Sequence, residues 1–528
     1  MFKERNTDAV FSVLFLVLFI TIVYFFQYRG ALGESDLYRV LMGLLDGAVS
    51  QEGLASNLHY GRGFGFGYIL AFYEFVPAAI MRDPDKVTAI INTVGLLSIT
   101  CGLVFFWLSV ALVYGVRAAL MAMVVFAFSP MILELATSGH QILVAFAFLS
   151  AAAVFLFLPV TGWHAIVAAL VGMLLLICGL TMRAEIFLAL PYLVLARVKF
   201  SSPRVFVTSL LVRTAAPAAA FAIFFLLKAK VATFPSDGPS SSFFDQFYRW
   251  SNLGPGIVYL ALGCGIVTVT VGALAGLVIV VRGIRSKNGE TYRELAEKLV
   301  GPIALILVPT AFWIANPQPA RHFILVLAGF AILIGCLGET VWRRNPVAAL
   351  VALLVIVVGN QALSAAVRPT LLAMNEARSP YRPAPEAYRT FTHAPLGWSW
   401  LHHEALDARR RNWNALGDEI ATACDAGVII FSDEAEQLIT RLYVGGVPVK
   451  AMSSRIDGFV AFTGIRDGRT FIFISKMTGW PADAIKAIVT DHSFDRFQLY
   501  NDPYTLSTYD ILPIPTDRNA KFGCPIPG

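Results

Sequence analysis

The chain has 528 residues, of which 57% are hydrophobic and 14% charged, with a formal net charge of +6. Soluble domains usually carry about 25% charged residues, so a soluble globular enzyme is excluded. The modest charge does not indicate a nucleic-acid partner. Several apolar runs approach the roughly 20 residues that cross a bilayer, which predicts a polytopic α-helical membrane protein.

The apolar runs predict eleven transmembrane helices. The first run follows the basic sequence "MFKER" and lacks a cleavage pattern, so it is interpreted as a retained signal anchor. The segment 64–81 contains Glu74, Pro77 and two glycines, and either crosses, re-enters or lies along the interface. The predicted crossings are 9–26, 87–114, 118–134, 141–159, 164–181, 184–197, 205–227, 255–281, 299–316, 321–339 and 347–364.

The distribution of basic residues favours an interfacial or re-entrant segment 64–81. In that case every basic cluster falls on the side of the N-terminus, which the positive-inside rule places in the cytoplasm. The first loop and the residues after 365 then lie outside, in the periplasm or extracellular space. The cytoplasmic basic residues would be Arg117, Arg197, Lys199, Arg204, Arg282, Arg285, Lys287, Arg293, Lys298, Arg343 and Arg344.

The composition changes after residue 365. Residues 366–405 contain several Pro and Arg residues and are expected to form a linker. Residues 406–528 alternate short apolar runs with helical patterns, which predicts a soluble α/β domain with a mainly parallel sheet. The predicted strands are "GVIIFS", "PVKAM", "TFIFIS" and "FQLYN". Cys424 and Cys524 form a disulfide or stay reduced, and their spacing does not decide between the two.

The first external loop contains acids beside the membrane. In "ESDLYRVLMGLLDGA" the apolar residues recur at helical spacing, which predicts an interfacial helix over 36–49. Asp36 lies in its first turn, where the helix dipole favours an anion, so a purely structural role is one interpretation. A catalytic base at the membrane surface is the other. Asp46 falls on the polar face of the same helix.

The same side of the membrane contains cations that suit a phosphate group. Arginine binds phosphate oxygens with two parallel hydrogen bonds. Lysines at helix ends often only extend toward water, and a lone histidine in a turn, such as His140, is more often structural than a ligand. No group of His, Cys and acidic residues has metal-ligand spacing. The cationic candidates are His59, Arg62, Arg183, Lys228, Arg321 and His322.

The order of these features resembles the GT-C superfamily of integral-membrane glycosyltransferases. It is most similar to the branch of lipid A aminoarabinose transferases and protein O-mannosyltransferases, whose first external loop carries D-E-x-R-Y. Here "DLYRV" retains Asp36 and Arg39 but lacks the second acid and the final Tyr, with Glu34 as an upstream acid. Looser matches are the Ser129–Pro130 helix end, the turn with Arg183, and "ARHF", where His322 replaces a Tyr. In layout the resemblance covers residues 9–365.

The resemblance implies an inverting glycosyltransferase of EC class 2.4, with residues 1–365 as its catalytic module. It would act at the outer face of a bacterial inner membrane. A polyprenyl-phosphate sugar would be the donor, and a lipid, glycan or protein the acceptor. Some branches use a divalent metal ion and others do not. Asp36 would be the general base, assisted by Glu34. Arg62, Arg183 and Arg321 would hold the donor phosphate, with His59, His322 and Lys228 as weaker candidates.

A multi-pass transporter or flippase for a lipid or solute, with an external domain, is the alternative. Such a protein also places polar residues within its helices. It would often contain inverted repeats and broken helices, and the sequence shows no internal repeat.

Overall fold

The computed structural model describes most of the helical part of the chain and five strands near its C-terminus. The described residues are 11–12, 14–22, 66–77, 80, 84–136, 139–231, 253–285, 289–314, 320–376, 427–430, 449–451, 458–466, 469–477 and 496–500.

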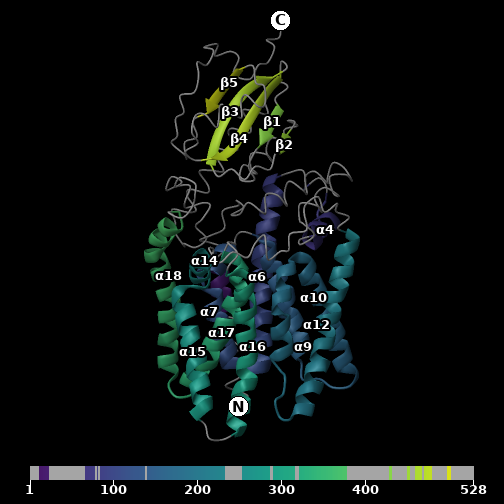
Figure 1. The fold of residues 1–528 in the computed structure, drawn as a ribbon, viewed down its shortest axis with the longest axis vertical. Helices are drawn as coiled ribbons and strands as arrows, with labels where there is room; N and C mark the ends of the chain where they lie inside the picture. The colour runs from purple at the N-terminus through teal and green to yellow at the C-terminus, as the bar shows by residue number, and fades with distance from the viewer. Residues whose placement is uncertain are drawn as a thin grey trace.

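The chain is a multi-pass α-helical membrane protein (Figure 1). Within the described residues, six helical segments are long and apolar enough to cross a bilayer: Ala89–Tyr114, Trp163–Met182, Pro203–Lys228, Leu295–Trp313, Ile324–Trp342 and Pro346–Leu363. Four further apolar helices are shorter: Val116–Ala127, Gln141–Phe157, Ala184–Leu195 and Ile266–Arg282. The full count of eleven crossings therefore stays a prediction.

The helices follow the predicted order closely. Those of the first half are α4 (Phe66–Phe75), α6 (Pro84–Tyr114), α7 (Val116–Ala127), α8 (Pro130–Leu135), α9 (Gln141–Phe157), α10 (Trp163–Met182), the 3₁₀ helix η1 (Ala184–Ala189) and α11 (Leu190–Leu195). Those of the second half are α12 (Pro203–Val231), α14 (Leu253–Cys264), α15 (Ile266–Arg285), α16 (Gly289–Trp313), the 3₁₀ helix η3 (Ala320–Phe323), α17 (Ile324–Trp342) and α18 (Pro346–Glu376).

Three predicted helices are interrupted in the structure. The predicted helix 255–281 breaks into α14 and α15 at Gly265, whose φ of 86° is accessible mainly to glycine. The predicted helix 118–134 breaks before Ser129, whose side chain caps α8 by accepting a hydrogen bond from the Ile132 N–H. The predicted crossing 184–197 is a six-residue 3₁₀ helix followed by a six-residue α-helix that contains Pro191. These two pieces together are shorter than the roughly 20 residues of a typical spanning helix.

The ambiguous segment 64–81 contains α4, a helix of ten residues. At about 1.5 Å per residue it covers roughly half of the 30 Å hydrocarbon layer, so it does not cross alone. It packs beside the C-terminal end of α10. Gly67 is required there, since a Cβ atom on it would lie 2.3 Å from Thr181 Oγ1.

Helix α17 forms the centre of the bundle. Every residue from Ile324 to Gly335 is buried, and α17 packs against α7, α15, α16 and α18. Its crossing with α7 is close: a Cβ on Gly335 would lie 2.3 Å from the Ala118 carbonyl oxygen. Small residues at such crossings let helices approach in the membrane. By contrast, α12 and α18 expose large apolar side chains such as Leu211 and Leu354 on the outside of the bundle, where they suit contact with lipid tails.

Two adjacent residues of α18 form hydrogen bonds with backbone groups at two of the helix breaks. Asn360 is buried, and its Oδ1 accepts a hydrogen bond from the Thr268 N–H at 3.1 Å, in the first turn of α15. Its Nδ2 donates to Thr268 Oγ1. Gln361 Nε2 donates to the carbonyl oxygen of Phe128 at 2.8 Å, at the end of α7. Backbone groups freed within the membrane thus receive side-chain partners.

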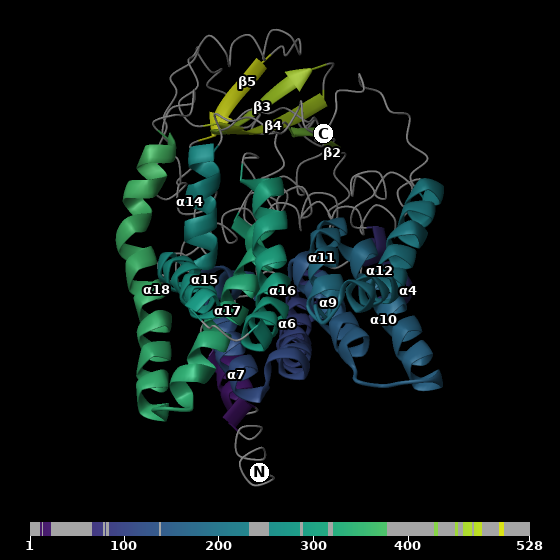
Figure 2. The ribbon, with the colours of Figure 1, turned by 60° about the horizontal axis from the view of Figure 1, so that its bottom comes forward.

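Most of the described basic residues near the helix ends lie at one end of the bundle. The end of α6, the start of α12, the end of α15 and the end of α17 lie together at this end of the bundle (Figure 2). The start of α9, the end of α10 and the start of α17 lie at the opposite end. The first set of ends carries Arg117, Arg204, Arg285 and Arg343, whereas the opposite end carries Lys86, Arg183 and Lys228 together with His140 and His322. The excess of arginines at the first end agrees with the positive-inside rule.

The C-terminal strands form one mixed sheet with the order β2-β1-β4-β3-β5. Its strands are β1 (Gly427–Ile430), β2 (Val449–Ala451), β3 (Gly458–Arg466), β4 (Arg469–Met477) and β5 (Arg496–Tyr500). β1 pairs in parallel with β2 and β4, whereas β3 pairs antiparallel with β4 and β5. The expectation of a mainly parallel sheet was wrong because β3 was missed. The helices predicted between the strands, and Cys424 and Cys524, lie outside the described residues.

The buried contact between Asn360 and Thr268 gives a stability prediction. Asn360→Leu keeps a similar side-chain volume but leaves the Thr268 N–H without its acceptor, which typically costs about 1–3 kcal/mol. We expect a lower melting temperature for the detergent-solubilised protein in a thermal unfolding assay. The control is Val358→Leu on the same helix, where Val358 is 54% exposed. Equal melting temperatures for both variants and the wild type would contradict this role.

Candidate functional site

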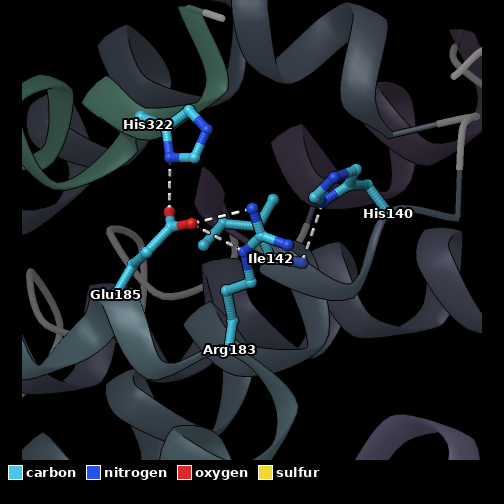
Figure 3. A network of polar contacts seen from close by, with 5 residues as sticks. All are labelled: His140, Ile142, Arg183, Glu185 and His322. Carbon is cyan, nitrogen blue, oxygen red and sulfur yellow. Dashed lines mark hydrogen bonds and ion pairs between the residues drawn. The ribbon is translucent and has the colours of Figure 1, made fainter. Parts of the chain in front are cut away.

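A buried ionic cluster joins segments that are far apart in the sequence. Arg183, Glu185 and His322 meet at the end of the bundle opposite to the basic clusters (Figure 3). Arg183 ends α10, Glu185 lies in the first turn of η1, and His322 lies in η3. The site is therefore built from the end of α10 and from two 3₁₀ helices.

Glu185 is the centre of the cluster. Its Oε1 accepts hydrogen bonds from Arg183 Nε at 2.8 Å and from Arg183 NH2 at 2.7 Å. Its Oε2 lies 2.7 Å from Nδ1 of His322. The exposed fractions of the Arg183, Glu185 and His322 side chains are 13%, 18% and 4%. Charges this poorly hydrated persist only when they are paired, and the network provides that pairing.

The local backbone explains why Arg183 and Glu185 face each other. Arg183 has an extended conformation, with φ of −155° and ψ of 111°, directly after the last turn of α10. The 3₁₀ helix begins at the next residue. This change of direction brings residues two apart in sequence onto one side, which a continuous α-helix would not do.

The ring of His322 is held from two sides. It packs against Trp313 at the end of α16, with 4.5 Å between the ring centroids. Because an ionised carboxylate can only accept hydrogen bonds, the contact with Glu185 places a proton on His322 Nδ1. Nε2 is then the nitrogen through which the ring accepts or donates toward other groups. A histidine oriented by a carboxylate in this way is suited to proton transfer or to binding an anion.

Arg183 keeps hydrogen-bonding capacity beyond the ion pair. Its bonds to Glu185 use Nε and NH2, and the described part of the chain gives NH1 no partner. A guanidinium can bind two anions at once through its separate N–H edges. The cluster can therefore hold an incoming phosphate at Arg183 without first breaking the bond to Glu185.

His140 lies in the same region and has a structural role that the sequence also allows. It is fully buried at the start of α9, and its Nδ1 accepts a hydrogen bond from the Ile142 N–H at 3.1 Å. Figure 3 draws it in the same close-up as the ionic cluster. His140 is thus a helix cap.

The structure brings together only part of the predicted site. Arg183 and His322 share Glu185, and Arg321 is the neighbour of His322 in η3, although its side chain is outside the described residues. Lys228 lies in the last turn of α12, at the same end of the bundle as the cluster. Glu34, Asp36, His59 and Arg62 lie outside the described residues, so their placement stays a prediction.

Glu185 is the site residue that the sequence reasoning did not select. It stands beside Arg183 in a short polar interruption between two apolar runs. An acid two residues from an arginine in such a place was a usable signal, because the charge of each needs a partner there. No feature of the sequence around Trp313 distinguishes it from the many other aromatic residues as a contact of His322.

The described residues were also tested for a metal site. Among them, no group of three or more His, Cys, Asp and Glu side chains is arranged to hold an ion. Glu185 and His322 alone would supply two ligands, fewer than most protein metal sites use.

Comparisons with known proteins found similarity only among solved structures. No protein-family model and no curated protein sequence matches the chain. The structure is similar to ArnT from Cupriavidus metallidurans bound to undecaprenyl phosphate, with a TM-score of 0.48 and 14% identity over 84% of this chain and 86% of that one. It is also similar to the apo form of the Archaeoglobus fulgidus oligosaccharyltransferase, with a TM-score of 0.46 and 11% identity over 84% of this chain and 64% of that one.

A third similar structure is the oligosaccharyltransferase AglB of the same archaeon in complex with an inhibitory peptide and a dolichol-phosphate. Its TM-score is 0.41 with 12% identity, again over 84% of this chain and 64% of that one. The chain thus has structural similarity to ArnT and to the archaeal oligosaccharyltransferase AglB, which are GT-C membrane glycosyltransferases, over about 85% of its length.

A double-mutant cycle measures whether the ion pair stabilises the fold. Arg183→Gln and Glu185→Gln should each lower the free energy of unfolding by about 1–3 kcal/mol, because each removes one member of a poorly hydrated ion pair. The loss of stability in the double variant should be smaller than the sum of the two single losses, by about 1 kcal/mol or more. Chemical unfolding in detergent micelles gives the four values.

The chain contains a matched control pair. Arg343 NH2 also lies 2.7 Å from Glu339 Oε1, but the Arg343 side chain is 69% exposed. Their cycle should give a coupling of about 0.5 kcal/mol or less. Equal couplings for the two pairs would show that burial adds nothing at Arg183.

Proposed function

We propose that the chain is a GT-C-type glycosyltransferase that moves a sugar from a polyprenyl-phosphate donor to an acceptor at the outer face of the bacterial inner membrane. The N-terminus would be cytoplasmic and the C-terminal domain periplasmic or extracellular. The observation that carries the proposal is the Arg183–Glu185–His322 cluster at the end of the bundle away from the basic residues.

The position of α4 links this cluster to the loop that contains the predicted base. Gly67 packs on Thr181, two residues before Arg183, and the Tyr68 hydroxyl donates to the Gly139 carbonyl at 2.9 Å. Arg62 precedes Gly67 by only five residues. Even a fully extended chain covers at most roughly 18 Å over that length. The described start of α4 therefore lies next to Arg183, and this position supports a site shared by Arg62 and the cluster.

The reaction would be a single displacement. A hydroxyl or amine of the acceptor attacks the anomeric carbon, and the bond between that carbon and the phosphate oxygen breaks. Asp36 takes the proton of the nucleophile, and polyprenyl phosphate leaves with the bonding electrons. Because the leaving phosphate gains negative charge, cations placed against it lower the barrier. The sugar is transferred with inversion at the anomeric carbon.

The remaining residues are assigned by their chemistry. Arg183 binds the leaving phosphate through the donors that its bond to Glu185 leaves available. Glu185 fixes the orientations of Arg183 and His322, and is a positioning residue. Arg62 and Arg321 complete the phosphate site, Glu34 orients or assists Asp36, and His59, His322 and Lys228 are weaker candidates for contacts with the donor.

The resemblance allows a divalent metal ion, which would stabilise the leaving phosphate by its charge. The described residues supply too few ligands for one, so the proposed steps do not pass through a metal. Glu34 and Asp36, the predicted acids of the site, lie outside the described residues and would add carboxylate ligands.

The helix breaks at Gly265 and Phe128 do not favour the transporter alternative. In transporters, broken helices usually direct their free backbone groups into a binding site at the membrane midplane. Here Asn360 and Gln361 satisfy groups at the two breaks from within the protein. Among the described residues the breaks thus have a packing explanation.

The role of Asp36 is tested by substitution to Asn. Asp36→Asn keeps the size of the side chain but removes the base, so transfer should fall by about 10²–10⁴-fold. The assay uses membranes supplied with radiolabelled undecaprenyl-phosphate-linked sugars and a panel of lipid, glycan and protein acceptors. Asp46→Asn is the matched control, because Asp46 falls on the polar face of the same predicted helix, and it should retain activity. Full transfer by a folded Asp36→Asn protein would refute the assignment.

The role of Arg183 gives a separate prediction. Arg183→Gln should reduce transfer by about 10–100-fold, because one charge-assisted contact to the leaving phosphate is lost. Arg183→Lys should recover only part of this, since an ammonium group cannot replace the planar fork. Kinetics with varied donor concentration separate the effects on kcat and KM. Arg344→Gln at the other end of the bundle should change neither. Unchanged kinetics in a folded Arg183→Gln protein would remove Arg183 from the site.

A further inference from the structure

A groove on α12 lies at the opposite end of the bundle from the ionic cluster. It has a volume of about 390 Å³ and is lined by Arg204, Val205, Thr208, Ser209, Val212 and Arg213. These residues form two neighbouring rows along the first turns of the helix, with Arg204, Thr208 and Val212 in one row and Val205, Ser209 and Arg213 in the other. The groove therefore combines two arginines and two hydroxyls with two apolar side chains.

The groove opens toward the membrane rather than toward another helix. Helix α12 packs against α10 and α11 at the margin of the bundle (Figure 2). Val212 is 69% exposed and its neighbour Leu211 is 66% exposed. Exposed apolar residues in a spanning segment face lipid tails. Any molecule that fills this groove must then be compatible with the bilayer.

The two arginines are not paired with carboxylates of the described chain. No ion pair involves Arg204 or Arg213 among the described residues. Nearby Arg197, in contrast, donates to the carbonyl oxygen of Phe157 and so caps the end of α9. The absence of an ion pair is more notable for Arg213 than for Arg204, because Arg213 lies ten residues into a spanning helix. An arginine in such a position usually has a functional partner or extends toward the interface.

The other polar groups at this helix end are already used. The Ser202 side chain accepts a hydrogen bond from the Val205 N–H, and the Thr208 hydroxyl donates to the Arg204 carbonyl oxygen at 2.9 Å. The groove thus offers an anion the two guanidinium groups and the Ser209 hydroxyl. A phosphodiester at the membrane surface, with its acyl chains along Val205 and Val212, matches both the charge and the apolar surface.

We propose that this groove binds an anionic phospholipid of the leaflet at the basic end of the bundle, with Arg204 and Arg213 contacting its headgroup from the two edges of the groove. This site is separate from the donor site at Arg183. It would tie the orientation of α12, and with it the packing of α10 and α11, to the lipid composition of that leaflet.

The test measures lipid retained by the full-length protein. The wild type is purified in a neutral detergent, incubated with equal amounts of phosphatidylglycerol and phosphatidylcholine of identical acyl chains, and analysed by native mass spectrometry. The wild type should retain phosphatidylglycerol in preference. The variant Arg204→Gln/Arg213→Gln should retain at least about tenfold less, because two charge-assisted contacts are lost.

Two further variants keep the result interpretable. Arg343→Gln/Arg344→Gln changes the net charge equally at the same end, where both side chains are exposed, and should retain lipid as the wild type does. Val212→Trp leaves both arginines in place but fills the groove from an exposed position, and should also lose lipid. A separate titration with inorganic phosphate should not displace the bound phosphatidylglycerol.

Three outcomes would overturn the proposal. They are equal retention of the two lipids by the wild type, equal loss in the two double variants, and displacement of the lipid by millimolar inorganic phosphate. The second would show a diffuse surface charge effect, and the third would show a site for free anions. Loss of lipid in the groove variants alone would support the proposal.

Discussion

Hydrocarbon cannot form hydrogen bonds, and this constraint governs the whole helical part of the protein. Every backbone group within the membrane needs a partner supplied by the protein. Long helices meet this requirement by themselves, but the chain breaks its helices after Ala127 and at Gly265. At both places, the adjacent residues Asn360 and Gln361 of α18 supply hydrogen bonds. One peripheral helix thus makes two irregularities in neighbouring helices compatible with the bilayer.

The same constraint shapes the candidate site. Arg183 and Glu185 lie in a turn between apolar segments, where isolated charges would be costly. Pairing them reduces this cost and fixes the orientation of the Arg183 guanidinium group. Glu185 also orients the ring of His322, which packs against Trp313. The requirement for charge pairing and the requirement for a rigid anion site are therefore met by the same contacts. A site built at helix ends also has access to the interface, where a lipid phosphate would arrive.

The two ends of the bundle have different electrostatic characters. One end carries the basic residues that predict a cytoplasmic side, and the groove on α12 belongs to it. The other end holds the paired Arg183–Glu185–His322 cluster and receives α4 from the first loop. At the first end the arginines of the groove are unpaired among the described residues and suit membrane lipids. At the second, Arg183 is paired with Glu185, which also contacts His322.

The sequence by itself determined the class of protein, the order of the helices and the segregation of basic residues, because apolar length and charge placement are local properties. It also located four of the five strands. It missed β3 although Asp467–Gly468, a common hairpin-turn pair, separates β3 from β4. Only the tertiary structure decided that Glu185 joins Arg183 to a histidine 137 residues away, and that Asn360 reaches Thr268. These contacts depend on how separate helices pack, and no local pattern of residues encodes that.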